Sequence, residues 1–272
     1  MQMKKYGSAA AFGALVGAML IFPQDAAEAA FRGLSLFSGS VLPMLGPFMI
    51  CMLMLSSRIP GGAWVRAAMG WLCGSPGGAR LMQSFSFRGK GALRYAAATG
   101  TMSPMFFLGT LGKWLGSAQM GRILLISHVL GALGMALCFR GWAGRKESLL
   151  QPMPFFQALQ NSAQALLLIA LCMMLGCVAA KMAACVFPGL PLWCTALLQC
   201  TLEVTAGVQS LLLLDVPHTP AFVCAACSFG GLSLLLQNTA FWQEGGVSMG
   251  ELCLIRCGHA LLSFLICLLL GG

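Results

Sequence analysis

The chain has 272 residues, of which 58% are hydrophobic and only 8% are Asp, Glu, Lys or Arg. A soluble domain carries about 25% charged residues, so the composition excludes an ordinary soluble domain and indicates a polytopic membrane protein. The net charge of +9 comes from basic residues in short connections between apolar runs. Such a distribution reports membrane topology, and we expect no nucleic-acid partner.

The first residues resemble a signal peptide. Lys4 and Lys5 precede an apolar run at residues 7–22, and small residues including AEAA follow at 27–30. We expect a retained first span with a cytoplasmic N-terminus and an external loop up to residue 32. Cleavage near Ala30 is the alternative reading of the same pattern.

Nine apolar runs approach the length of about 20 residues that crosses a bilayer. Three are interrupted by helix-breaking residues: CGSPGGA at 73–79, ATGTMSP at 98–104 and SFGGLS at 228–233. The runs are 7–22, 33–56, 63–82, 95–112, 120–139, 158–180, 192–214, 220–240 and 250–270.

Basic residues assign the sides of the membrane. Arg58 lies before run 63–82 and Arg66 lies near its start, while Arg80, Arg88, Lys90 and Arg94 lie near or after its end. Cytoplasmic connections are enriched in Lys and Arg, so this run should enter and leave on the cytoplasmic side as a re-entrant hairpin. Run 192–214 should re-enter from outside, with EVTAG (203–207) at its tip. The remaining runs give seven full spans and an external C-terminus.

A constant offset relates the two halves of the chain. Adding 129 to a residue number aligns GSPGG (74–78) with EVTAG (203–207), and TGTMSP (99–104) with SFGGLS (228–233). Aligned breaks with opposite entry sides predict an inverted-topology repeat, as in many secondary transporters. We therefore expect an all-α membrane protein with broken helices and two re-entrant hairpins. The predicted parts are 1–32, the repeats 33–140 and 158–272, and a cytoplasmic linker at 141–157.

The broken segments are the candidate substrate site. Irregular backbone at membrane depth is tolerated only where it is buried in protein or lines a water-filled cavity, and freed amides can hold anionic groups. The residues at these breaks offer hydroxyls, an amide and close backbone approach. The candidate substrate-binding residues are Ser75, Gly77, Thr99, Thr101, Ser103, Thr205, Ser228, Gly230, Gly231, Ser233 and Gln237.

Four ionisable residues within apolar runs have two readings each. Glu203 lies in an apolar run, where an acid usually faces a partner or water, so we predict a cavity-facing coupling residue; a structural cap is the alternative. His128 and His259 are more typical of hydrogen-bonded packing than of a proton relay. Arg256 either extends to the surface or holds an anion.

The thirteen cysteines suggest no metal or redox site. Most lie within apolar runs, and no second C-x-x-C pair or metal-spaced histidine accompanies Cys224 and Cys227, so we interpret them as small hydrophobic residues. The sequence also lacks G-x-S-x-G, H-E-x-x-H and a P-loop lysine. We expect no enzyme activity, no metal and no cofactor.

The ordered set SVLPMLGPFMI, GSPGGA, TGTMSPMFFLG, RILLISHVLGAL, LEVTAG and SFGGLSLLLQ resembles the YlbJ family of sporulation integral membrane proteins, from about residue 33 to the C-terminus. That family is grouped with nucleoside-recognition Gate domains, akin to concentrative nucleoside transporters. The resemblance implies movement of dipicolinic acid from the mother cell across the outer forespore membrane.

Several positions depart from the family pattern. Gly100 and Thr101 stand where the family has asparagines, and Leu235 stands where it has a histidine. A different small anionic or heterocyclic substrate, including a nucleoside-like one, therefore stays open. The rival from another class is a non-transporting scaffold of the spore envelope. The lipid bilayer is the other expected partner, and the sequence does not indicate an oligomeric state.

Overall fold

The computed structural model describes residues 2–59, 62–75, 77–82, 85–87, 89–141, 143–145, 153–214 and 216–272. The described chain is almost entirely helical, with one two-stranded antiparallel sheet. Its elements are α1 (Gln2–Ile21), α2 (Pro23–Leu36), η1 (Phe37–Val41), α3 (Leu42–Arg58), α4 (Ala63–Cys73), α5 (Gly77–Met82), β1 (Phe85–Phe87), α6 (Lys90–Thr99), η2 (Phe106–Leu111), α7 (Gly112–Trp114), α8 (Ala118–Leu137), β2 (Ala143–Arg145), α9 (Phe155–Val186), α10 (Leu192–Leu202), α11 (Val204–Leu212), α12 (Thr219–Phe229), α13 (Gly231–Trp242), η3 (Gln243–Gly245) and α14 (Met249–Leu269).

Five described helices are long and apolar enough to cross a membrane. They correspond to the predicted runs 33–56, 120–139, 158–180, 220–240 and 250–270. Runs 7–22 and 95–112 are not among them. The apolar part of the first, Ala9–Ile21, is shorter than a span. The second is divided, because α6 ends at Thr99 and the wide-turned helix η2 begins only at Phe106.

The external loop predicted before residue 33 is helical instead. α2 starts at Pro23 and runs through η1 into α3, so that Pro23–Arg58 forms one helical stretch of 36 residues, part of which is apolar enough to cross a membrane. Pro at the first position and the alanines that follow both favour a helix. The wide turn η1 precedes Pro43 and Pro47, whose missing N–H groups interrupt the regular hydrogen-bond ladder.

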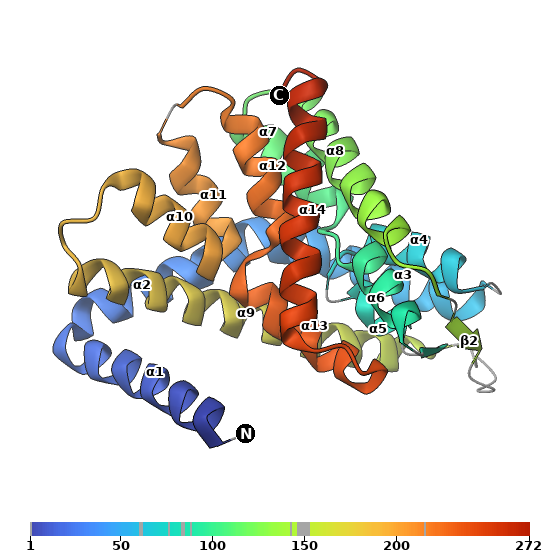
Figure 1. The fold of residues 1–272 in the computed structure, drawn as a ribbon, viewed down its shortest axis with the longest axis horizontal. Helices are drawn as coiled ribbons and strands as arrows, with labels where there is room; N and C mark the ends of the chain where they lie inside the picture. The colour runs from blue at the N-terminus through green and yellow to red at the C-terminus, as the bar shows by residue number, and fades with distance from the viewer. Residues whose placement is uncertain are drawn as a thin grey trace.

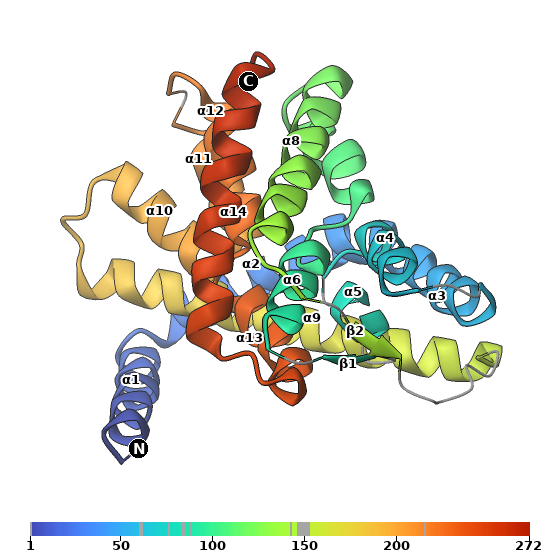
Figure 2. The ribbon, with the colours of Figure 1, turned by 45° about the vertical axis from the view of Figure 1, so that its right-hand side comes forward.

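The helices form two groups that cross (Figures 1 and 2). α8, α12 and α14 stand side by side, with the C-terminus at one end of α14. α9 runs across the foot of α14 and packs along α2. α1 projects away from this body in both views. The broken segments, which are the candidate substrate site, lie where the two groups of helices cross.

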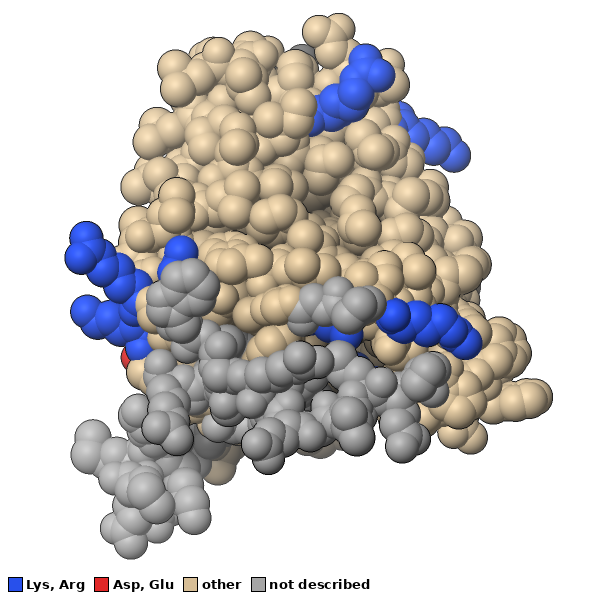
Figure 3. All heavy atoms as spheres, turned by 90° about the vertical axis from the view of Figure 1, so that its right-hand side faces the viewer, with Lys and Arg blue, Asp and Glu red and all other residues tan. Residues whose placement is uncertain are grey.

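Two basic connections meet at one end of the molecule. β1 pairs with β2, with Phe85 opposite Arg145, and Arg94 Nη1 donates to the carbonyl of Gly141 at 3.3 Å. The connections before α6 and after α8 therefore lie together, as the charge pattern predicts. Figure 3 shows an uncharged band on one face, with Lys and Arg side chains above and below it. Arg88 and Lys146 fall outside the described residues.

The helix bounds repeat at the offset found in the sequence. Shifting α4 by 129 gives 192–202, which are the bounds of α10, and shifting α6 gives 219–228, within one residue of α12. The same shift moves α8 to 247–266, close to the bounds of α14. The spacing of helices thus agrees with the spacing of breaks.

Candidate functional site

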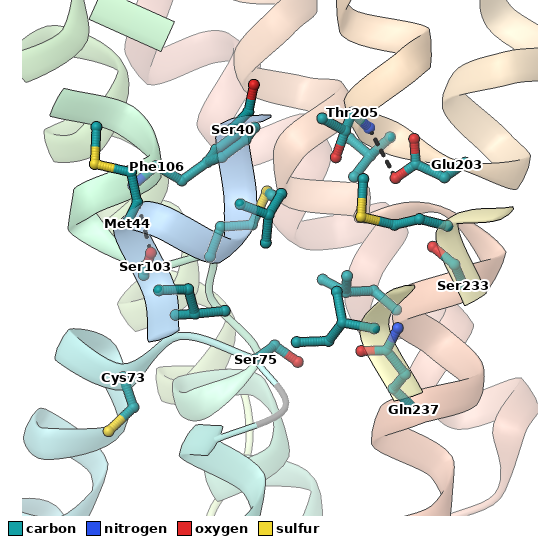
Figure 4. A pocket seen from close by; sticks show the side chains of 17 residues that line it. Ser40, Met44, Cys73, Ser75, Ser103, Phe106, Glu203, Thr205, Ser233 and Gln237 are labelled. Carbon is teal, nitrogen blue, oxygen red and sulfur yellow. Dashed lines mark hydrogen bonds between the residues drawn. The ribbon is translucent and has the colours of Figure 1, made fainter. Parts of the chain in front are cut away.

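The three interrupted runs at 73–79, 98–104 and 228–233 and the α10–α11 junction at Glu203 make four interrupted segments, which surround one cavity between the crossing helices (Figure 4). The cavity holds about 610 Å³ of atom-free space, part of which opens to the surroundings. The lining residues are Ser40, Val41, Met44, Leu45, Cys73, Ser75, Met102, Ser103, Phe106, Ile169, Met173, Glu203, Val204, Thr205, Ser233, Leu234 and Gln237.

The turn between α4 and α5 is hydrogen-bonded to the break after α6 and to α13. After α4 ends, the Ser75 N–H donates to the carbonyl of Thr101 at 2.7 Å. The Ser75 hydroxyl donates to Asn238 Oδ1 on α13, also at 2.7 Å. Freed backbone at this tip is thereby satisfied by the neighbouring segments, and the tip forms one edge of the cavity.

Glu203 joins α10 to α11 and caps the second of these helices. Its two carboxylate oxygens accept the N–H groups of Thr205 (3.1 Å) and Ala206 (2.7 Å). The residue is only 2% exposed. Glu203 lines the main cavity and also caps a helix, and its predicted coupling role stays a prediction.

Glu203 also borders a second cavity, of about 480 Å³. This cavity contains the side chains of Glu28 and Arg32 from α2 and of Lys181 from α9. Lys181 Nζ lies 3.1 Å from Asp25 in a partly exposed ion pair. The second cavity is thus charged, whereas the lining of the first is mostly apolar, and Glu203 stands between them.

The fourth interruption begins α13 and places two polar side chains at the cavity. Gly230 and Gly231 both have positive φ, 84° and 73°, a conformation that glycine adopts without strain. A Cβ on Gly231 would lie 3.0 Å from the carbonyl of Cys200, so α13 packs closely on α10. Ser233 and Gln237 then extend from α13 into the cavity.

The structure brings five of the eleven predicted substrate-binding residues to the cavity, together with Glu203. The five are Ser75, Ser103, Thr205, Ser233 and Gln237. The other six, all buried, lie near the breaks but outside the lining: Gly77, Thr99, Thr101, Ser228, Gly230 and Gly231. Among these, Thr99 donates to the carbonyl of Tyr95 and serves its own helix.

His128 connects two of the breaks. Its Nε2 accepts the backbone N–H of Met102 at 3.0 Å, and its Nδ1 lies 2.7 Å from Ser228 Oγ. A neutral imidazole that accepts through Nε2 carries its proton on Nδ1, so Nδ1 donates to Ser228. His259 Nε2 donates to the carbonyl of His128 at 2.8 Å. Both histidines are buried, which agrees with the predicted packing role.

Arg256 does not extend to the surface. It is 3% exposed, and its guanidinium occupies the space beside Gly100 where a side chain would otherwise lie. The surface-anchor reading of Arg256 is therefore wrong, and the anion-holding alternative stays a prediction. Arg80 is half-buried and donates to Asn161 Oδ1 on α9 at 2.8 Å.

Several lining residues carry no sequence signal that marks a site. Met44, Phe106, Ile169 and Met173 belong to ordinary apolar runs and reach the cavity through helix crossing alone. Ser40 lies in the FSGSV turn (37–41), and Pro43 just after it is the one sequence feature that indicates an interrupted helix there. All thirteen cysteines have free thiols, and the described residues contain no group of three or more metal-ligating side chains.

Comparison with known proteins gives one informative relative. The chain is 31% identical over 157 residues to the "Sporulation integral membrane protein YlbJ" of Bacillus subtilis, a match that covers 49% of this chain and 38% of the relative. No family model matches the chain, and no solved structure matches it. The similarity confirms the resemblance to the YlbJ family that the sequence motifs predict.

Proposed function

We propose that the chain is a sporulation-associated membrane transporter for a small aromatic dicarboxylate. The single observation that carries the proposal is the cavity at which four interrupted segments meet. A scaffold has no need for broken helices around a space, whereas transporters bind substrates at such breaks near the middle of the membrane. The printed name of the Bacillus subtilis relative supports the link to sporulation.

An inverted repeat would explain how the cavity opens to alternate sides. The matching bounds of α4 with α10 and of α6 with α12 support two related halves. In this proposal α4–α5 and α10–α11 are re-entrant hairpins that enter from opposite sides. Rocking of one half against the other then changes which hairpin covers the substrate.

Dipicolinic acid is the proposed substrate, and the outer forespore membrane is the proposed location. Both come from the family resemblance. Ser103, Thr205 and Ser233 on the cavity lining provide neutral hydrogen-bond partners for such a ring. Glu203 is the proposed coupling residue, since it lies between the main cavity and the charged one.

A neutral, nucleoside-like ring is the second candidate substrate. One observation favours it: the described lining of the main cavity includes the Glu203 carboxylate but no Lys, Arg or His. A fully ionised dicarboxylate would meet a like charge there without a compensating cation.

Uptake into proteoliposomes tests the proposal directly. Purified chain should accumulate labelled dipicolinate above protein-free liposomes. A thermal-shift panel of dipicolinate, uridine and simple dicarboxylates then identifies the substrate class. Stabilisation by uridine without dipicolinate would replace the substrate but keep the site. No uptake and no stabilisation by any compound would leave the envelope scaffold as the better function.

A further inference from the structure

Two buried polar side chains on α13 face the main cavity without a partner among the described residues. Gln237 is 2% exposed, and both its amide oxygen and its amide nitrogen lack a hydrogen bond. Ser233 is 5% exposed, and its hydroxyl is also unpaired. Residues four apart share one face of a helix, and Figure 4 shows both side chains on the same wall of the cavity.

The adjacent amide on the same helix shows the contrast. Asn238 Oδ1 accepts from Ser75 at 2.7 Å, and its Nδ2 donates to the carbonyl of Leu234 at 2.9 Å. Gln237 has no such arrangement. Cys172 on α9 lies beside Gln237, but its thiol and the Gln237 amide are not in the geometry of a hydrogen bond. Because buried polar groups are nearly always paired, the Gln237 amide is suited to a group that enters the cavity.

The charges around the cavity restrict what that group can be. The titratable side chains on its described lining are Cys73 from α4 and Glu203 from the α10–α11 junction, and Cys172 lies next to Gln237. Both Glu203 oxygens already accept backbone N–H groups. A second and third negative charge in this apolar space would be repelled, so a dicarboxylate that binds here must lose charge first.

This inference rests on the proposed function. We propose that Gln237 binds a ring carboxyl group of the substrate in its protonated form. The amide oxygen accepts the carboxyl O–H, while the amide N–H donates to the carboxyl C=O. A carboxylate has acceptors only and would leave the Gln237 oxygen unpaired. The Ser233 hydroxyl, one turn away, donates to the ring nitrogen or to the second carboxyl group.

The proton balance of the cycle follows. The substrate takes one proton from the aqueous phase on the side from which it enters, and it returns that proton to water on the other side. Each substrate molecule therefore moves one proton in its own direction. Glu203 disfavours the more highly charged form by repulsion.

Calorimetry of dipicolinate binding to the full chain in detergent tests this between pH 5 and pH 8. Titrations in two buffers with different ionisation enthalpies give the number of protons taken up. We expect about one proton per ligand in the range where free dipicolinate is fully ionised, and an affinity that falls about tenfold per pH unit there. Binding without proton uptake across this range would overturn the inference.

A matched pair of variants locates the effect. Gln237→Leu should abolish the linked proton uptake and weaken dipicolinate binding by about 10- to 100-fold, since two hydrogen bonds are lost. Gln164→Leu makes the same change at an exposed position of α9 and should leave both unchanged. If Gln237→Leu does not fold, the proton count of the unmodified chain decides alone.

The outcomes separate this inference from the proposed function. Dipicolinate binding that is equal in Gln237→Leu and the unmodified chain sinks the role of Gln237 but keeps the transporter. Uridine binding without proton uptake, together with no dipicolinate binding, shows that the edge recognised is a ring amide and overturns the protonated-carboxyl proposal. If no probe binds the unmodified chain, the cavity is not a substrate site and both proposals fall.

Discussion

The space where Gly74 would carry a side chain is filled by the backbone of Ser103. A Cβ on Gly74 would lie 2.5 Å from Ser103 N and 2.9 Å from Ser103 Cα. The tip of the α4–α5 segment and the break after α6 are therefore in direct backbone contact. This contact holds two walls of the cavity against each other without any side chain between them.

Gly74→Ala should destabilise the protein by at least about 2 kcal/mol. Gly74 has φ of 69° and ψ of 176°, a conformation that is essentially confined to glycine and costs other residues about 1–3 kcal/mol, and the contact with Ser103 adds strain. Thermal unfolding in detergent measures the loss. Gly13→Ala, in α1 where a Cβ meets nothing within 4 Å, should not destabilise. Equal melting temperatures for both variants would contradict the close contact.

His128→Ala should also be strongly destabilising, by about 2–4 kcal/mol. The substitution leaves the partly buried N–H of Met102 and the buried hydroxyl of Ser228 without His128 as a partner, each at about 1–3 kcal/mol, in part relieved by water. His218→Asn is the control, because His218 is exposed at φ of 60°, a conformation that Asn tolerates. A silent His128→Ala would show that the two breaks do not depend on this bridge.

The sequence predicts the breaks well because their causes are local. Adjacent glycines, and proline within apolar runs, interrupt a helix wherever they occur. The same reasoning fails where tertiary contacts decide. Nothing near His128 in the sequence indicates that Met102 and Ser228 are its partners, since they lie 26 and 100 residues away.

Two further misses have a similar origin. The segment after Pro23 reads as a loop because it contains Asp25 and Glu28, yet α9 packs along it and its alanines favour a helix. For Arg256, which lies near the start of a span, the surface-anchor alternative is the one that fails. Arg256 is buried because its guanidinium occupies the space that the lack of a side chain at Gly100 leaves free. Gly100 lies far from α14 in the sequence, so the residues of α14 do not indicate this contact.

The Ser75–Asn238 hydrogen bond should contribute about 0.5–1.5 kcal/mol to stability. A double-mutant cycle of Ser75→Ala and Asn238→Ala isolates it, since the two residues lie on segments far apart in the chain. The coupling energy from thermal unfolding should fall in this range. A value near zero would mean that the α4–α5 tip is not held to α13 by this bond.

Glu203→Gln should change transport more than stability. The amide retains an acceptor for one backbone N–H of the α11 cap, so unfolding should be easier by only about 1 kcal/mol. Glu251→Gln is a matched control, because Glu251 sits in the exposed capping box of α14. Dipicolinate uptake across a pH series should change in Glu203→Gln and not in Glu251→Gln. An unchanged profile in both would leave Glu203 with a structural role only.

Cysteine labelling in a cysteine-free background tests the predicted topology. Single cysteines at Arg58 and Lys90 should react from the cytoplasmic side, and one at Gly116 should react from the outside. The β1–β2 pairing places the connections before α6 and after α8 at one end, and the 20-residue α8 separates the second of them from the turn at Gly116. About 30 Å of helix, the thickness of the hydrocarbon core, lies between these positions. Labelling of Arg58 and Lys90 from opposite sides would make α4–α5 a full span, and the re-entrant hairpin would have to be abandoned.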